Sequence, residues 1–342
     1  MTKRLVCMLV LTALVVSSVS CAPKEKTTGH LTVLGTPTEE YIDIVCKAFE
    51  AKTGIKTEWV RMSSGEALAR IRAEKDKPTF SVWWGGPADG QIAAQAEGLV
   101  EKYVPPSAAK IPSYYKDAEG YWHGIYVGAL SFGSNTKWLA EHNVSAPASW
   151  ADLLKPEFKG QISMAHPATS GTAYTMMSTI LQVLGEEQGW EYLKQFNGQI
   201  YHYTKAGSGP KGVVQTGEVG VGIVFGHDWV TSVEEGYPIQ ITFPSEGTGY
   251  EIGAVALIKN APEPAEAKRF IEFALTAECQ NLGKQAKAYQ FLTAPDADPP
   301  ANVPYKLADL TVIDYDFDWA GNNRKAFTDK FTKEIEPNIP TQ

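Results

Sequence analysis

The sequence predicts an α/β protein made of two halves. Short apolar runs alternate with segments whose apolar residues recur at helical spacing, first over residues 31–84 and again over residues 161–225. Two glycine-containing extended runs, 124–132 and 250–258, predict strands on which the chain crosses between the halves. With 342 residues, of which 44% are apolar, the chain is long enough for two ordinary domains or one large one.

The first half contains three predicted strands separated by two predicted helices. In chain order these are a strand over 31–34, a helix over 39–52, a strand over 55–60, a helix over 63–74 and a strand over 80–84. Thr53-Gly54 ends the first helix, and Gly85-Gly86 follows the third strand. This alternation is typical of a parallel α/β layer.

The second half repeats the alternation, and the remainder of the chain is mainly helical. The predicted elements are a strand over 161–164, helices over 171–184 and 186–197, a strand over 219–225, helices over 265–275 and 279–285, a proline-rich loop over 294–304 and a terminal helix over 322–333. Tyr201 and Tyr203 are expected on one face of a further strand.

Residues 1–20 predict a secretory signal. Lys3 and Arg4 precede an apolar stretch over residues 5–16, and small residues lead up to Cys21. The stretch is shorter than the roughly 20 residues that a membrane-spanning helix needs. We therefore expect an exported protein of the periplasm or cell surface.

Two kinds of cleavage fit the residues before Cys21. Ser18-x-Ser20 is compatible with an ordinary signal-peptidase site, whereas a following cysteine resembles a bacterial lipobox, although Ser18 stands where leucine is usual. We expect lipidation of Cys21, with residues 21–29 as a tether, because acylation would consume a thiol otherwise exposed in an oxidising compartment. Cys46 and Cys279 are expected to be buried apolar residues, with a disulfide between them as the alternative.

The charge of the chain limits its partners. Without residues 1–20 the chain has 29 basic and 39 acidic residues, a net charge of −10. Such a charge argues against nucleic acid or an anionic membrane surface as the main partner, but it does not constrain a local pocket. We expect a monomer that meets the membrane only through its acyl chains.

Three loops share the features of an anion or polyol site. Thr36-Pro37-Thr38, Ser63-Ser64-Gly65 and Thr169-Ser170-Gly171-Thr172 each open a helix, where free N–H groups and the helix dipole favour an anion. In open α/β sheets ligands bind beyond the carboxyl ends of the strands. Simple N-capping is the alternative for each loop. The expected ligand-binding residues here are Thr36, Thr38, Ser63, Ser64, Gly86, Ser170, Gly171 and Thr172.

The stretch 225–229 places His227 and Asp228 beside each other after an apolar strand. A general-base histidine oriented by an aspartate is one interpretation. The sequence has no Gly-x-Ser-x-Gly or His-Glu-x-x-His motif, and its other histidines lack metal-ligand spacing. Neighbours on an extended strand end point to opposite sides, so only one of the two is expected to face a pocket. We predict no catalytic residue, metal site or cofactor.

Several stretches, taken in order, resemble one family. LTVLGTPTEE, SVWWGGPADG, SWADLLKPEFKGQISMAHPATSGTAY and GEVGVGIVFGHDW resemble the extracellular solute-binding proteins of bacterial ABC importers, in the branch for iron(III), 2-aminoethylphosphonate, thiamine and hexose phosphates. The resemblance implies a two-lobed periplasmic-binding-protein fold of type II, with a ligand cleft between lobes joined by crossing strands and an ABC permease as partner. The expected lobes are residues 30–127 with 257–342, and residues 128–256, with the C-terminal helices on either lobe.

The resemblance also bears on the ligand. Ferric-binding members of the branch carry adjacent tyrosines just after the strand that here ends at Phe225, whereas this chain has His227-Asp228, so the hard phenolate ligands are missing. The His-Asp pair is similar to that of members that bind hexose phosphates and organophosphonates, where such residues contact the organic part of the ligand.

We therefore expect a small phosphorylated or phosphonylated solute. Helix N-termini and hydroxyls hold a phosphate without needing a basic residue. Asp228 and Glu251 would accept hydrogen bonds from sugar hydroxyls or pair with an ammonium, and Trp84 or Trp229 would pack on a sugar ring. A ferric-iron receptor is the alternative, and a His/Asp-dependent phosphatase, for which no nucleophile is visible, is the second.

Overall fold

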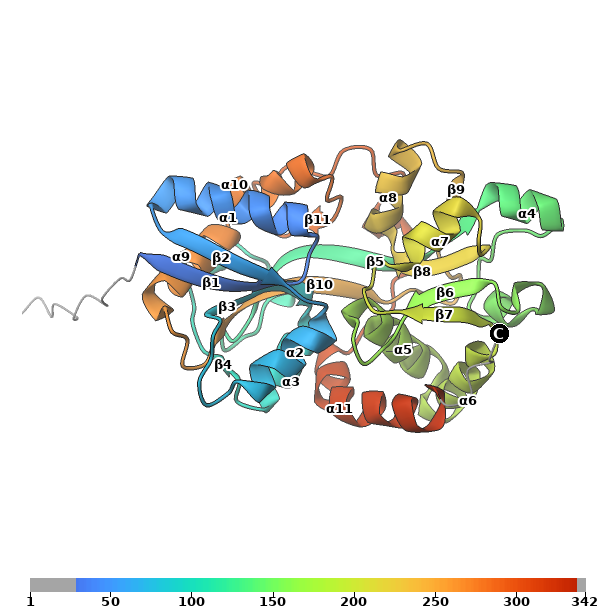
Figure 1. The fold of residues 1–342 in the computed structure, drawn as a ribbon, viewed down its shortest axis with the longest axis horizontal. Helices are drawn as coiled ribbons and strands as arrows, with labels where there is room; N and C mark the ends of the chain where they lie inside the picture. Colours follow the sequence, from blue (N-terminus) through green and yellow to red (C-terminus); the bar gives the residue numbers. More distant parts are fainter. Residues whose placement is uncertain (1–28, 337–342) are drawn as a thin grey trace, which may run out of the picture.

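The computed structural model describes residues 29–336. The predicted signal, Cys21 and nearly all of the predicted tether lie outside these residues. Within them, no helix is both long and apolar enough to cross a membrane. Figure 1 shows two α/β lobes side by side along the long axis, joined by long strands at the centre.

The lobes are connected through one strand. The sheet order is β2-β1-β3-β10-β5-β8-β6-β7. Strand β5 (His123–Asn135) pairs through its first half with β10 (Tyr250–Ile258) and through its second half with β8 and β9. The extended runs predicted at 124–132 and 250–258 are thus strands at the centre of the molecule, as Figure 1 shows.

The first lobe is built mainly from the N-terminal third of the chain. Strand β1 pairs in parallel with β2 and β3, which confirms the predicted parallel layer. Its elements are β1 (His30–Gly35), α1 (Glu39–Thr53), β2 (Lys56–Arg61), α2 (Ser64–Ala73), β3 (Val82–Pro87), α3 (Ala88–Ala96), β4 (Val100–Glu101), α9 (Pro264–Ala274), α10 (Ala277–Gln280) and β11 (Phe291–Leu292).

The second lobe is built around a second parallel group. Strand β6 pairs in parallel with β7 and β8. Its elements are α4 (Thr136–His142), β6 (Ile162–Ala165), α5 (Gly171–Leu184), α6 (Glu186–Asn197), β7 (Ile200–Thr204), α7 (Pro210–Thr216), β8 (Val221–Phe225), α8 (Gly226–Glu234) and β9 (Ile239–Thr242). Tyr201 and Tyr203 lie on β7, as expected.

The C-terminal helix α11 (Phe317–Glu334) contacts both lobes. Its Phe327 and Phe331 belong to the core of the second lobe. Its Arg324 forms a buried ion pair of 2.5 Å with Asp89 of α3 in the first lobe. Helices α9 and α10 pack with α1 in the first lobe. The lobe boundaries expected from the resemblance stay a prediction.

The structure differs from the predicted elements in places where the local pattern is weak. Helix α3 was not predicted because its residues 88–94 are all buried and show no amphipathic spacing. Helix α11 begins at Phe317 instead of residue 322, because Asp316 caps it by accepting a hydrogen bond from the Trp319 amide at 2.8 Å. The helix expected at 279–285 is split into the short α10 and a 3-10 helix over Asn281–Ala286. Cys46 and Cys279 are both buried with free thiols.

Candidate functional site

A polar cavity lies in the cleft between the two lobes. The cavity and its mouth hold about 570 Å³, which is within the usual range for small-molecule sites. Most of its wall is formed by residues at or just after the carboxyl ends of β1, β2, β3, β6 and β8, as the rule for α/β sheets predicts. All eleven predicted ligand-binding residues line it: Thr36, Thr38, Ser63, Ser64, Gly86, Ser170, Gly171, Thr172, His227, Asp228 and Glu251.

The loop between β1 and α1 contributes two threonines. Thr38 caps α1, because its hydroxyl accepts a hydrogen bond from the Tyr41 amide at 3.4 Å. The hydroxyl of Thr36 is buried and has no hydrogen-bond partner among the described residues. A buried polar group of this kind is costly unless a further partner satisfies it. Thr36 therefore has hydrogen-bonding capacity left for a ligand.

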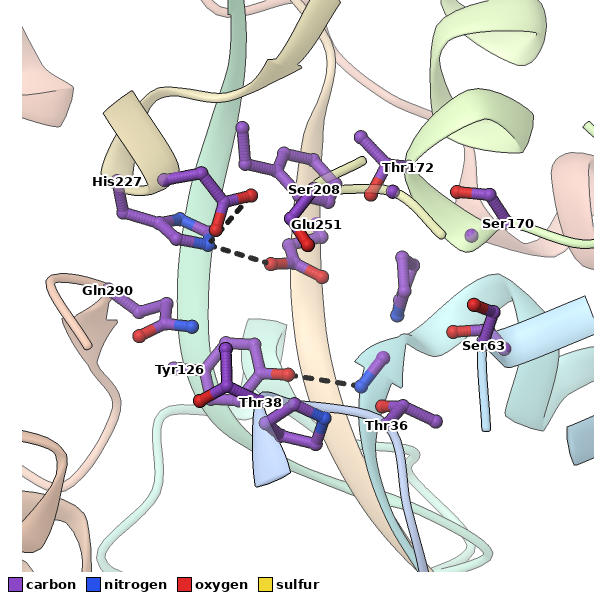
Figure 2. Close-up of a pocket in the computed structure, with 18 of the residues that line it drawn as sticks. Thr36, Thr38, Ser63, Tyr126, Ser170, Thr172, Ser208, His227, Glu251 and Gln290 are labelled. Atoms are coloured by element: carbon purple, nitrogen blue, oxygen red, sulfur yellow. Dashed lines mark hydrogen bonds and ion pairs between the residues drawn. The ribbon is translucent and has the colours of Figure 1, made fainter. Parts of the chain in front are cut away.

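Gly86 is required by the backbone and by its neighbours. Its φ is +79°, a left-handed conformation that favours glycine. A Cβ at this position would overlap the Ser64 hydroxyl and lie 2.9 Å from the Thr36 hydroxyl. The Gly86 amide donates to the phenol oxygen of Tyr126 at 3.0 Å, as Figure 2 shows. The glycine thus lets two loops and strand β5 meet at the cavity.

Helix α2 of the first lobe and helix α5 of the second lobe begin across the cleft from each other. Ser63 and Ser64 start α2, and Ser170 and Gly171 start α5. Ser170 caps its own helix by accepting from the Ala173 amide at 3.3 Å. Figure 2 shows Ser63, Ser170 and Thr172 along one side of the cavity. Two helix N-termini with their hydroxyls concentrate N–H and O–H donors on this side.

Arg61 adds a positive charge that the sequence reasoning missed. It is the last residue of β2 and lines the cavity. Its guanidinium contacts the Ser63 hydroxyl and the Pro37 carbonyl oxygen, each at 3.4 Å. We expected a phosphate site without a basic residue, whereas the cavity has Arg61 in its wall. Arg61 lies two residues before Ser63 at the end of a predicted strand, and this position could have identified it as a residue of the site.

Other lining residues were not among the predicted ligand-binding residues. Tyr126 lies on the crossing strand β5, Gly207 and Ser208 lie between β7 and α7, and Gln290 lies just before β11. Burial raises the pKa of Tyr126 well above its usual value, so its phenol stays protonated.

The prediction that only one of His227 and Asp228 faces a pocket is wrong. The strand ends at Phe225, and both residues lie in the first turn of helix α8 and line the cavity. Consecutive residues on a helix differ by about 100° in direction rather than 180°. The His227 Nε2 lies 4.0 Å from a carboxylate oxygen of Asp228 and 3.9 Å from one of Glu251 (Figure 2).

Burial sets the protonation of this end of the cavity. It lowers the pKa of His227, against the opposing effect of Asp228. It also raises the pKa of Glu251 well above its usual value, and the nearby carboxylate of Asp228 raises it further. Both shifts favour the uncharged forms, an imidazole and a carboxyl group that each donate and accept hydrogen bonds.

The expectation that Trp84 or Trp229 packs on a ligand ring is wrong. Their side chains are fully buried and do not line the cavity. Trp84 packs edge-on against Tyr41 with ring centroids 5.1 Å apart, and Trp229 lies in a separate apolar cluster under β8. The aromatic residues that line the cavity include Tyr126 and Phe225, and Phe225 stacks on the His227 ring with ring centroids 5.6 Å apart.

The chemistry of the cavity is that of recognition. Among residues 29–336, no cluster of His, Cys, Asp and Glu could hold a metal ion. Donors dominate one side of the cavity. The other side has Asp228 together with groups that both donate and accept hydrogen bonds. A polar cavity closed between two α/β lobes that share a crossing strand defines the class of two-lobed solute-binding proteins.

The chain belongs to the family of bacterial extracellular solute-binding proteins, whose model matches residues 91–317. Proteins of this family capture small solutes for ABC importers. The chain is 36% identical to the periplasmic binding protein AfuA of Actinobacillus pleuropneumoniae, solved with fructose-6-phosphate bound, with a TM-score of 0.87 over 91% of this chain and 99% of that one. This similarity confirms the predicted two-lobed fold.

Two relatives known from sequence support the family. An uncharacterised protein of Haemophilus influenzae is 35% identical over 95% of this chain and 96% of its own length. A putative 2-aminoethylphosphonate-binding periplasmic protein of Salmonella typhimurium is 27% identical over 68% of each chain. AfuA and the Salmonella protein are both named as binding proteins, which fits the expectation of a binding protein rather than an enzyme.

Proposed function

We propose that this protein captures a small phosphorylated or phosphonylated solute, in the first place a hexose phosphate, and delivers it to an ABC permease. The observation that carries the proposal is the convergence of the loop at Thr36 and the N-termini of α2 and α5 on one side of the cavity. Arg61 joins them through its contact with the Ser63 hydroxyl. A tetrahedral oxyanion needs several donors at once, and these elements supply them from both lobes.

The other side of the cavity suits the uncharged part of such a ligand. His227, Glu251 and Gln290 offer groups that both donate and accept, which is how hydroxyls are read. The carboxylate of Asp228 would repel a phosphate but accepts hydrogen bonds from a polyol. A phosphomonoester with a hydroxylated body therefore matches the polarity of both ends.

The relatives support the same ligand class. AfuA was solved with a sugar phosphate, and the Salmonella protein is described as binding a phosphonate. Both ligands combine a tetrahedral phosphorus oxyanion with a small organic group. We favour the hexose phosphate because the cavity has several groups for hydroxyls, whereas a simple ammonium needs only the carboxylate of Asp228.

We also propose where the protein works. Its relatives are periplasmic, and residues 1–20 carry a secretory signal pattern, so the folded part acts in the periplasm as a monomer. Acyl chains on Cys21 would tether it to the membrane next to its permease. Mass spectrometry of the mature protein tests this directly, because acylation and simple cleavage at Cys21 give different N-terminal masses.

The test of the ligand is native mass spectrometry of the purified protein, followed by calorimetry with hexose phosphates, aminoethylphosphonate, thiamine and Fe(III). We expect tight binding of a phosphorylated ligand and release of the unchanged ligand on denaturation. Iron binding with tyrosinate colour and none of phosphates would favour the ferric receptor. Release of inorganic phosphate with turnover, lost in Asp228→Ala, would favour the phosphatase.

A further inference from the structure

The first turn of α2 contacts the opposite lobe as well as the cavity. Ser63 and Ser64 line the cavity, but within the described part of the chain its lining includes neither Gly65 nor Glu66. These two residues instead face the segment before α5 and the end of β7, both in the second lobe. The first turn of α2 thus contacts both the cavity and the second lobe.

Gly65 makes a backbone contact across the cleft. Its amide, one of the free donors at the start of α2, donates to the Thr169 carbonyl oxygen at 2.9 Å. A Cβ on Gly65 would overlap the Ala168 carbonyl oxygen and lie 2.8 Å from that of Thr169. Its φ is outside the left-handed range. The requirement for glycine therefore comes from the second lobe and not from the local backbone.

Glu66 connects the same two elements through its side chain. One carboxylate oxygen accepts a hydrogen bond from the Ser63 amide at 3.2 Å and so caps α2. The other forms an ion pair of 2.5 Å with Lys205, which directly follows β7. The Lys205 side chain is 73% exposed, so this pair contributes little by itself. It adds a charge interaction to the backbone contact of Gly65.

We propose that Gly65 and Glu66 are positioning residues that seat the second lobe and thereby set the affinity of the cavity for its ligand without touching that ligand. The inference rests on the proposed function, because it concerns the closed state in which the solute is held. Contacts from both lobes exist only when the lobes meet. A change that keeps Gly65 away from Thr169 therefore lowers the closed population and the apparent affinity by the same factor.

Gly65→Ala tests the backbone contact. Alanine is the better helix former, so the ligand-free protein should melt at an unchanged or higher temperature. Its affinity for the hexose phosphate that binds the wild type should fall at least tenfold. Gly212→Ala is the matched control, because a Cβ added to Gly212 in helix α7 would meet no atom within 4 Å. An affinity equal to that of the wild type in Gly65→Ala would overturn the proposal.

Lys205→Met tests the ion pair. We expect a two- to fivefold loss of affinity that disappears at high salt and is restored by Lys205→Arg. Lys194→Met is the control, because Lys194 pairs only within helix α6, with Glu191. In a double-mutant cycle, Glu66→Gln should add no further loss to Lys205→Met, since glutamine keeps the cap. Fully additive losses would show that the two side chains do not act together.

A ligand-free measurement separates this inference from the proposed function. Cysteines placed by Glu66→Cys and Lys205→Cys should be joined by a short bis-maleimide whenever the lobes close, and adding Gly65→Ala should slow that reaction severalfold. Equal rates with and without Gly65→Ala would refute the lobe contact. A wild type that crosslinks normally but binds no phosphorylated solute would instead refute the proposed function alone.

Discussion

The buried ion pair between Arg324 and Asp89 gives the sharpest prediction of stability. It joins α11 to α3 at 2.5 Å, with side chains that are 4% and 0% exposed. The guanidinium also lies 4.2 Å from the ring centre of Tyr174 in α5. The Arg324→Met change keeps much of the side-chain volume but leaves the Asp89 carboxyl buried without its cation.

The expected cost follows from that burial. Breaking a buried pair by removing one partner costs about 3–5 kcal/mol in unfolding free energy. For a chain of this size that corresponds to a fall in melting temperature of roughly 6–10 °C. The double variant Asp89→Asn, Arg324→Met should recover much of the loss, because no uncompensated charge remains.

The loss should also depend on pH in a defined direction. Burial already raises the pKa of Asp89 to about 6, although Arg324 opposes this effect. Without Arg324 that pKa rises further above the unfolded value, so the folded state binds the extra proton and stability falls as pH rises through this window. The deficit of Arg324→Met should therefore be larger at pH 8 than at pH 5.

Urea unfolding followed by tryptophan fluorescence, at both pH values, measures the wild type and the two variants. A loss below about 1 kcal/mol for Arg324→Met would refute the reasoning, since such a value is typical of an exposed pair. So would a double variant as unstable as the single one, because the cost would then not come from the stranded carboxyl.

Three further predictions concern the cavity. Gly86→Ala should weaken ligand binding at least tenfold, because the added Cβ overlaps the Ser64 hydroxyl and displaces it from the cavity wall. Gly54→Ala, at a φ of +72° with free space around it, adds a similar left-handed strain of about 1–2 kcal/mol but should bind normally in calorimetry. Arg61→Gln should weaken ligand binding roughly 10- to 100-fold and reduce the salt dependence of binding, because it removes a positive charge from the cavity. The exposed Arg269→Gln should change neither property, and equal effects of the two variants would contradict a role for Arg61 at the cavity. Glu251→Gln should stabilise the ligand-free protein more at pH 8 than at pH 5. Because the pKa of Glu251 is higher in the folded than in the unfolded chain, the wild type loses stability as the pH rises above the unfolded pKa of this group, and glutamine removes that loss. Thermal melts with the opposite trend would show an ionised Glu251.

The sequence was sufficient for the features that depend on neighbouring residues. Glycine and hydroxyl residues after apolar runs predicted the loops at Thr36, Ser63 and Ser170, because helix caps are local in sequence. Their meeting at one cavity followed from the general geometry of α/β sheets. The two crossing strands were visible because each is a mainly apolar run that contains glycine.

Tertiary packing decided what each side chain does. Trp84 and Trp229 are as aromatic as Phe225, but only Phe225 faces the cavity, since the others fill cores made by distant segments. His227 and Asp228 share one surface because helix α8 begins at Gly226, directly after the strand, so these two residues are helical rather than extended. Tyr126, on a predicted crossing strand, and Gln290, just before β11, line the cavity although no local pattern marked them as site residues.

The first turn of α2 shows most clearly which features the local sequence determines and which the tertiary structure determines. Ser63-Ser64-Gly65-Glu66 predicted a helix start with hydroxyls for a ligand, and those parts of the motif need only their own neighbours. That Gly65 meets Thr169 and Glu66 meets Lys205 depends on residues more than a hundred positions away along the chain. Contacts of that separation are set by how the two sheets are joined through β5, which local sequence does not encode.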